Sequence, residues 1–274
     1  MGLADDIKKN AENSNVKIQS SEAAKLEKIL NKMFYLEKNV EEETAFVKQV
    51  MTRGLQTQER IGLHASAMTA SDKKFCVRQQ VLSLLYKQLQ GEQLQVGLKR
   101  IFEEGNAIHE KWQRLFIRAG YGKAKDMDRS RFNDEYELSF TPDGIVYIPE
   151  FYDGKMVVEI KSMNTFSFKH ATSHPSGRKQ MQFYLWLTGI KKGFVLAEDK
   201  NTQEIKIFLE DYDPETVAPF IDRLEQVKFY KQRALEEHKM VGRHELCKKS
   251  NCKMAEDCPM RDACWNIGIG RVRL

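Results

Sequence analysis

The sequence lacks any long apolar run, and it lacks the features that direct a protein into or across a membrane. Its 274 residues contain no apolar stretch near the roughly 18 residues that a membrane-spanning helix needs. The first residues, Met-Gly-Leu-Ala-Asp-Asp, show no hydrophobic region of a signal peptide. We therefore expect a protein without a membrane partner that stays inside the cell.

The sequence also has little excess of either sign of charge, and it has few cysteines. Lysine and arginine number 44 and the acidic residues 39, so the formal net charge is only +5. This balance is compatible with a nucleic-acid partner but does not require one. Only five cysteines are present, and all but Cys76 lie between residues 247 and 264. In an intracellular protein, such a cluster favours metal or cluster binding over disulfides.

The pattern of apolar residues predicts an α/β chain with a sheet enclosed by helices. Apolar residues at three- and four-residue steps predict helices over residues 21–53, and further helices near 105–112, 180–187 and 214–238. Short runs of β-branched and aromatic residues predict strands at 136–140, 145–148, 155–161, 193–198 and 205–209. The segments 120–134 and 164–177 are polar and are predicted to be loops.

Two acidic residues and a lysine stand where two neighbouring strands are predicted. Asp143 lies in a turn before the strand at 145–148, and Glu159 and Lys161 lie on the next strand. Because alternate side chains share a face of a strand, Glu159 and Lys161 point the same way and Ile160 points into the core. Two carboxylates suit Mg²⁺ or Mn²⁺, and the lysine could lie beside a scissile phosphate. On their own, the same residues equally fit a hairpin with a solvated ion pair.

The cysteines near the end of the chain have spacings that are unusual for packing residues. Cys247, Cys252, Cys258 and Cys264 are separated by four, five and five residues. Thiolates in such a group select zinc or an iron–sulfur cluster. Cys76, taken alone between Phe75 and Val77, is typical of a buried core cysteine.

His109 lies in a predicted helix between Ile108 and Trp112. Taken alone, this histidine is typical of a half-buried helix residue with no chemical role.

Taken in chain order, these motifs resemble those of the RecB-type PD-(D/E)xK nucleases that carry an iron–sulfur cluster. This family includes the CRISPR-associated RecB-like exonucleases, the nuclease domain of AddB and phage recombination nucleases. The resemblance covers roughly residues 61–266, and the first 60 residues lie outside it. The matching motifs are Ser66…Cys76-Val-Arg78, Gly105…His109, Pro142-Asp143, Glu159-Ile160-Lys161, Gln180…Tyr184 and Cys258-Pro259…Cys264.

The resemblance implies a role for each residue of the acidic site. His109, Asp143 and Glu159, with the backbone carbonyl of Ile160, would hold Mg²⁺ or Mn²⁺. Lys161 would position the attacking water or offset charge on the transition state. The Gln-x-x-x-Tyr helix, with Gln180 and Tyr184, would contact DNA or steady the metal ligands.

The resemblance also implies that Cys76 joins three late cysteines around a [4Fe–4S] cluster. Cys258 and Cys264 fit the family pattern. The third late ligand is Cys252 or Cys247, with a preference for Cys252 because its loop is shorter. The family often has Cys-x₂-Cys-x₅-Cys, and neither of these two cysteines stands at the x₂ position.

Together these points predict a metal-dependent DNA exonuclease that acts on ends or single strands in recombination, repair or replication. The expected regions are a helical extension at 1–60, a RecB-like core with a central mixed sheet at 61–240, and a cysteine segment at 241–274. DNA is the expected partner, together with a replication or recombination protein at the N-terminal helices. The expected location is the cytoplasm of a prokaryotic or phage-infected cell. The alternative is a non-cleaving nucleic-acid-binding or partner-recruiting protein with a Zn²⁺ site.

Overall fold

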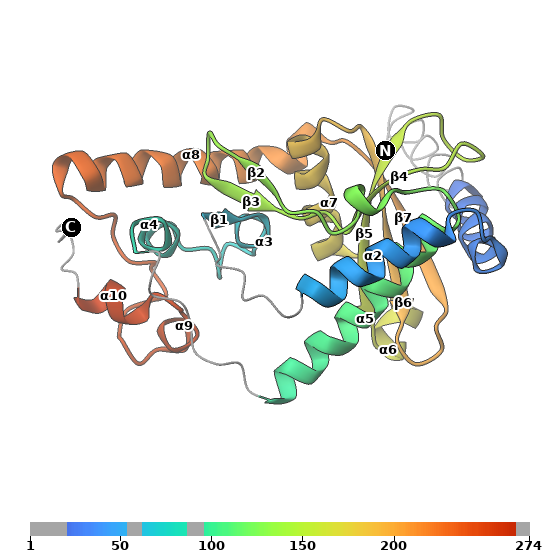
Figure 1. Cartoon of the computed structure of the whole chain (residues 1–274). Coiled ribbons are helices and arrows are strands. Elements are labelled where there is room, and N and C mark those ends of the chain that lie inside the picture. Colours follow the sequence, from blue (N-terminus) through green and yellow to red (C-terminus); the bar gives the residue numbers. More distant parts are fainter. Residues whose placement is uncertain (1–20, 54–61, 87–95, 267–274) are drawn as a thin grey trace, which may run out of the picture. The chain divides into compact units, whose positions relative to one another are not determined.

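The computed structural model describes residues 21–53, 62–86 and 96–266 (Figure 1). The chain forms two compact units that alternate along the sequence, and each is described here by itself. The predicted division at residues 60 and 240 stays a prediction. The first unit comprises Met1–Gln56, Phe102–Arg129 and Pro142–Tyr212, and the second comprises Thr57–Ile101, Ser130–Thr141 and Asp213–Leu274.

The first unit is built on a four-stranded mixed sheet with the order β4-β5-β6-β7. Its strands are β4 (Gly144–Tyr147), β5 (Lys155–Met163), β6 (Lys192–Asp199) and β7 (Ile205–Asp211). The central pair, β5 and β6, is parallel, and both outer pairs are antiparallel. The chain crosses between the parallel strands through α6 (Thr165–His170) and α7 (Pro175–Thr188). The predicted α/β fold with a central mixed sheet is confirmed.

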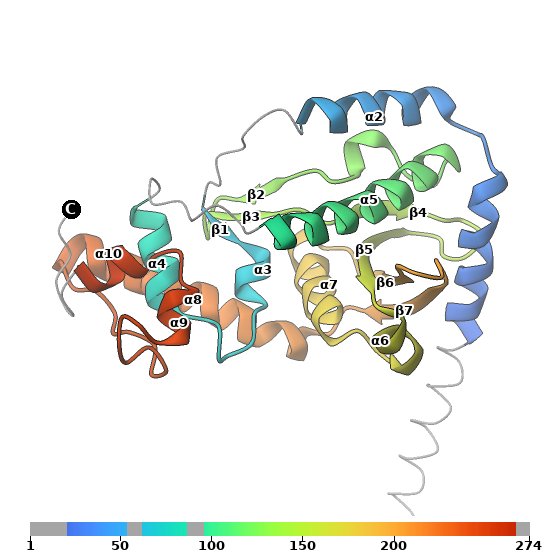
Figure 2. The same cartoon turned by 90° about the horizontal axis from the view of Figure 1, so that it is seen from below.

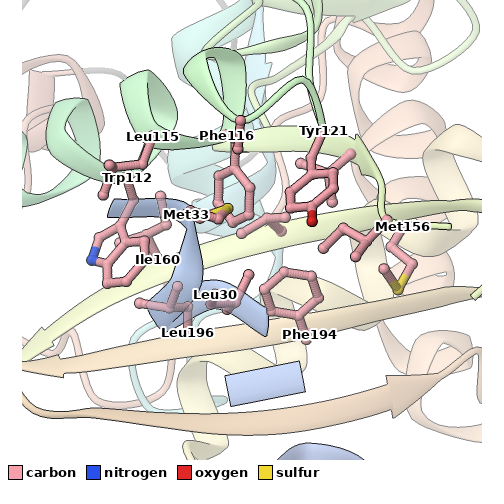
Figure 3. Packing of buried hydrophobic residues seen from close by; sticks show 14 of the residues in the cluster. Leu30, Met33, Trp112, Leu115, Phe116, Tyr121, Met156, Ile160, Phe194 and Leu196 are labelled. Atoms are coloured by element: carbon pink, nitrogen blue, oxygen red, sulfur yellow. The ribbon is translucent and has the colours of Figure 1, made fainter. Parts of the chain in front are cut away.

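Helices cover both faces of this sheet (Figure 2). On one face, α5 (Val96–Arg118) packs Trp112 and Phe116 against Phe194 and Leu196 of β6, in the core that Figure 3 shows. α7 packs against β5, β6 and β7 on the other face. Its helix ends where Gly189 adopts a left-handed conformation with φ of 70°, which glycine reaches at little cost.

The N-terminal helices take part in the same core. Residues 21–32 are helical, and the 3₁₀ turn η1 (Met33–Tyr35) and α2 (Val40–Arg53) follow. Leu30, Met33 and Phe46 are fully buried in the cluster that contains Trp112. These helices therefore help to form the sheet-covering layer, and a protein partner for them stays a prediction.

The second unit contains a small three-stranded sheet and several helices. Its strands β1 (Leu63–His64), β2 (Arg131–Asn133) and β3 (Leu138–Phe140) have the order β1-β3-β2. The long helix α8 (Pro214–Glu237) begins at a capping Asp213 and packs against α4 (Val77–Leu85). The remaining helices are α3 (Ala65–Met68), α9 (Lys253–Glu256) and α10 (Arg261–Asn266).

Two predicted loops are wrong in detail. The segment 164–177 contains α6, whose first turn is capped by the Asn164 side chain accepting from Ser167 N at 2.8 Å. The segment 120–134 contains the 3₁₀ turn η2 (Ala124–Asp126) and the strand β2. A six-residue helix gives too little periodicity to be recognised in a sequence.

None of the described helices is long and apolar enough to cross a membrane.

Candidate active site

Strand β5 presents Glu159 and Lys161 on the face that α7 covers. Ile160 is fully buried on the opposite face, among the residues that pack under α5. The predicted alternation along this strand is therefore what the structure has. The carboxylate of Glu159, only 3% exposed, lies 2.5 Å from Lys161 Nζ. Lys161 Nζ also donates to Gln180 Oε1 of α7 at 2.7 Å.

Asp143 ties the start of β4 to both β5 and α5. Its Oδ2 accepts from the backbone N–H of Ile160 at 2.6 Å, and its Oδ1 lies 2.9 Å from His109 Nδ1. Strand pairing ends one residue after Asp143, where Gly144 is opposite Val158. The Asp143 carboxylate therefore takes the place of a neighbouring strand as acceptor for Ile160.

The hydrogen bond between Ile160 N–H and Asp143 also indicates the direction of the Ile160 carbonyl. In a strand, the N–H and C=O of one residue face the same neighbour. Because the Ile160 N–H faces Asp143, its carbonyl oxygen faces that side of the strand too. The predicted carbonyl ligand is thus directed toward the carboxylate that would share the metal.

His109 reaches the site from one face of α5. One turn further along, Gln113 Nε2 donates to the backbone carbonyl of Asp143 at 2.8 Å. His109 contacts the carboxylate of Asp143 and Gln113 its backbone carbonyl, and these two contacts fix the position of Asp143 relative to α5. Gln113 was not singled out from the sequence, although its place four residues after His109 was the available signal.

A second buried carboxylate keeps α5 in position on the sheet. Glu198 of β6 accepts from Lys111 Nζ at 2.6 Å and from Trp112 Nε1 at 2.5 Å. Lys111 and Trp112 stand two and three residues after His109 on α5. They hold the helix so that its histidine meets Asp143.

The electrostatics of the site favour an added positive charge. Burial, followed by the charge of Asp143, raises the pKa of Glu159 to about 7. Burial alone lowers the pKa of His109, but the charges of Asp143 and Glu159 outweigh this and raise it. Tyr184 of α7 is 5% exposed, and burial together with the same two carboxylates raises its pKa. Two carboxylates are thus held together in a poorly solvated place.

The donor set fits a hard divalent cation. Two carboxylates and a backbone carbonyl are ligands that Mg²⁺ and Mn²⁺ prefer, and one imidazole nitrogen completes the set. No three His, Cys, Asp or Glu side chains in the described ranges surround one point in the present arrangement. Here Glu159 is paired with Lys161 and His109 with Asp143. A metal ion held by Glu159 would take the place of its Lys161 partner.

His174, at the start of α7, lies near enough to Lys161 for the charge of the lysine to act on it. It caps α7, where its Nδ1 accepts from Gly177 N at 3.0 Å. Burial and then the charge of Lys161 lower the pKa of His174. Of the other basic residues in this segment, Arg178 pairs with Glu210 at 3.2 Å.

The five cysteines line one cavity of about 540 Å³ in the second unit. All five are free. The structure therefore brings Cys76, at the start of α4, beside the four cysteines that follow α8. Basic residues share the lining of this cavity, namely Lys73, Lys74, Arg243 and Lys253, together with His244.

Arg78 connects the two cysteine-bearing segments. Its fully buried guanidinium donates through Nε to Cys264 Sγ at 3.2 Å and through Nη2 to the Cys264 carbonyl at 3.1 Å. A third bond, from Nη1 to Val241 O, is 2.7 Å long. Hydrogen bonds from a charged guanidinium are stronger than those from a neutral donor, so these contacts hold the Cys264 side chain in place. No role for Arg78 was predicted from the sequence, although the residue belongs to the Cys-x-Arg motif.

The thiols differ in their readiness to lose a proton. Burial raises the pKa of Cys76 and Cys258, and burial with the neighbouring Cys252 raises that of Cys247 to about 11. Backbone N–H groups, first that of Ala255, lower the pKa of Cys252. A bound metal would have to displace the protons of the first three.

Comparison with known proteins gives weak similarities only. The sequence matches no protein-family model and no curated protein. The solved alkaline exonuclease LHK-Exo from Laribacter hongkongensis is 16% identical, covers 64% of this chain and 90% of that chain, and has a TM-score of 0.45. Its complex with dAMP gives 17% identity, the same coverage and a TM-score of 0.47. A phage-related exonuclease from Haemophilus somnus 129PT is 14% identical, covers 68% and 99%, and has a TM-score of 0.43.

The raised pKa of Glu159 predicts a pH-dependent effect of removing its charge. An acid whose pKa rises from 4.5 to about 7 on folding loses stabilising free energy as pH increases between those values. In metal-free buffer, Glu159→Gln should therefore raise the melting temperature at pH 8 and change it little at pH 4.5.

The measurement is thermal unfolding of both proteins in EDTA across this pH range. Glu204→Gln is a suitable control because Glu204 is an exposed residue of the first unit. A Glu159→Gln variant that is less stable than the parent at pH 8 would contradict the electrostatic account.

Proposed function

We propose that the chain is a metal-dependent deoxyribonuclease, and that it acts as an exonuclease on DNA ends or single strands. The observation that carries this proposal is the convergence of His109, Asp143, Glu159 and Lys161 from three separate segments on one place. Buried acids, a histidine and a lysine in such contact are costly to a fold that has no use for them. The motif resemblance to RecB-type nucleases supports DNA as the substrate.

In this proposal, Asp143, Glu159, His109 and the Ile160 carbonyl hold Mg²⁺ or Mn²⁺. A divalent ion at such a site polarises a phosphodiester and lowers the pKa of a bound water. The raised pKa of Glu159 supports this assignment, because a cation would relieve the unfavourable charge that burial and Asp143 create.

Lys161 has a separate role, which depends on Glu159 exchanging its contact with Lys161 for one with the metal ion. With Glu159 as a metal ligand, the ammonium group of Lys161 would lose its carboxylate partner and could bind a phosphate oxygen. Gln180 Oε1, 2.7 Å from Lys161 Nζ, keeps the ammonium group directed into the site. A positive charge held there stabilises the charge that develops on the phosphate in the transition state. Tyr184, buried behind Gln180, steadies this arrangement.

Removing a charge from the site should remove cleavage while the protein stays folded. We expect Asp143→Asn, Glu159→Gln and Lys161→Met each to lower the cleavage rate by about a hundredfold or more, because each removes a metal ligand or a transition-state contact. The assay uses end-labelled single- and double-stranded DNA with Mn²⁺, and with EDTA as the metal-free comparison.

Lys155→Met is the matched control, since Lys155 lies on the same strand and is exposed. Closed circular DNA tests the exonuclease assignment, because it offers no end. Near-normal cleavage by the Glu159→Gln variant would contradict the metal assignment, and cutting of the circle would contradict the exonuclease assignment.

We propose further that the cysteine cavity holds a [4Fe–4S] cluster. Cys76, Cys258 and Cys264 are the proposed ligands, and Cys252 or Cys247 is the fourth, with the preference for Cys252 unchanged. In a four-iron cluster each thiolate binds a different iron atom, whereas four thiolates of a zinc site meet at one ion. The five thiols around one cavity offer four ligands for such a cluster with one to spare.

The positive charges around the cavity support the same assignment. A cluster with four thiolates carries net negative charge, and hydrogen bonds to its sulfurs tune its reduction potential. Arg78 donates to Cys264 Sγ, and Arg243 Nη2 donates to the Cys264 carbonyl at 3.1 Å. These contacts orient Cys264 and offset the charge of its thiolate.

Loss of a proposed ligand from either segment should remove the cluster. We expect Cys76→Ser and Cys264→Ser each to abolish the brown colour and the bound iron of anaerobically purified protein. Of Cys247→Ser and Cys252→Ser, only one should do so, because four ligands suffice. The measurements are iron and sulfide content per chain and the visible spectrum.

Iron that remains in the Cys76→Ser variant would show that the late cysteines form a site of their own. A colourless parent protein that contains zinc would favour the alternative of a zinc-binding protein.

A further inference from the structure

The helix α6 presents an aromatic side chain to solvent in the first unit. Phe166 is 76% exposed, although its helix packs the neighbouring Phe168 into the protein. The Phe166 ring lies 4.6 Å from the ring of His170, one turn later, at an interplanar angle of 41°. His170 Nδ1 also lies 2.8 Å from the Phe166 carbonyl, which fixes the imidazole beside the phenyl ring.

Hydrogen bonds with residues of β6 and β7 hold the backbone that carries this ring. Lys206 of β7 donates to the carbonyls of Phe168, Lys169 and Ala171 at 2.6, 3.2 and 3.2 Å. At the other end of α6, Thr165 Oγ1 donates to Asp199 Oδ1 at 3.0 Å. A contact made by Phe166 therefore orders little additional backbone, which keeps its entropic cost low.

The helix is also joined at both ends to segments that form the candidate active site. It begins two residues after β5, the strand of Glu159 and Lys161 (Figure 1). It is followed by His174, which lies close to Lys161 and caps α7. Lys169 and His170 are exposed on α6 itself. The exposed ring is thus flanked by basic residues and lies a few residues from the catalytic strand.

We propose that Phe166 stacks on a base of a single-stranded DNA segment whose phosphate lies at Glu159 and Lys161. The proposal rests on the nuclease function above and specifies its substrate as unpaired DNA. Stacking on an aromatic ring is tolerant of sequence because every base has a π-face. Bases in a duplex are already stacked on each other, so the ring discriminates in favour of unpaired strands. Lys169 binds the adjoining phosphate.

Equilibrium binding to a fluorescein-labelled oligothymidylate tests the proposal. It is measured by fluorescence anisotropy in EDTA at several salt concentrations, so that no cleavage occurs. We expect Phe166→Ala to weaken binding about tenfold, in line with the loss of one stacked base. The slope of log K against log salt should stay unchanged, because no phosphate contact is lost. Affinity for a blunt duplex should change much less.

Three further variants serve as controls. Tyr35→Ala removes another exposed ring of the same unit, 87% exposed, and should leave binding unchanged. Lys169→Ala should reduce the magnitude of the salt slope by about one, as expected for a lost phosphate contact. Phe166→Trp should keep the affinity, and its added tryptophan fluorescence should be quenched by the oligonucleotide.

The possible outcomes separate this proposal from the nuclease function. Unchanged single-strand affinity in Phe166→Ala, or an equal loss for duplex DNA, would overturn the stacking role whether or not the protein cleaves. A parent protein that cleaves no DNA, but loses single-strand affinity on Phe166→Ala, would overturn the nuclease function and retain the stacking role.

Discussion

The carboxylate of Asp143 is the contact on which the candidate active site depends. It bonds to the backbone of β5 at Ile160 and to His109 of α5, while Gln113 holds its carbonyl. A strand, a helix and the start of a second strand are therefore joined through one residue. On that side of β5 the Ile160 N–H bonds to the Asp143 carboxylate, and its carbonyl would be open to the proposed metal ion.

Burying two carboxylates next to each other is electrostatically unfavourable. Placing Glu159 beside Asp143 under a helix raises the pKa of Glu159, and Lys161 and His109 only partly compensate. The ion pairs Glu159–Lys161 and His109–Asp143 satisfy the site internally. A divalent cation would take over both carboxylates and leave the ammonium group for a phosphate. In the proposed mechanism, phosphate binding at Lys161 would follow metal binding at Glu159.

Local periodicity in the sequence predicted which side chains of this site share a face, whereas the grouping of His109 with Asp143 and Glu159 was expected only from the family resemblance. The alternation along β5 fixes which face Glu159 and Lys161 share, and the four-residue step fixes Gln180 and Tyr184 on α7. Features that depend on tertiary contacts could not be predicted from the sequence. The short helix α6 depends on Lys206 from a distant strand, and Gln113 and Arg78 act through backbone groups that are remote in sequence. No local pattern encodes such partners.

An anomalous difference map from crystals grown with Mn²⁺ tests the central claim most directly. We predict a manganese peak bound by Asp143 and Glu159, with His109 and the Ile160 carbonyl among its ligands, and Lys161 Nζ moved away from Glu159. A map without a peak at these residues, with the Glu159–Lys161 and His109–Asp143 pairs intact at a Mn²⁺ concentration that supports cleavage, would contradict it.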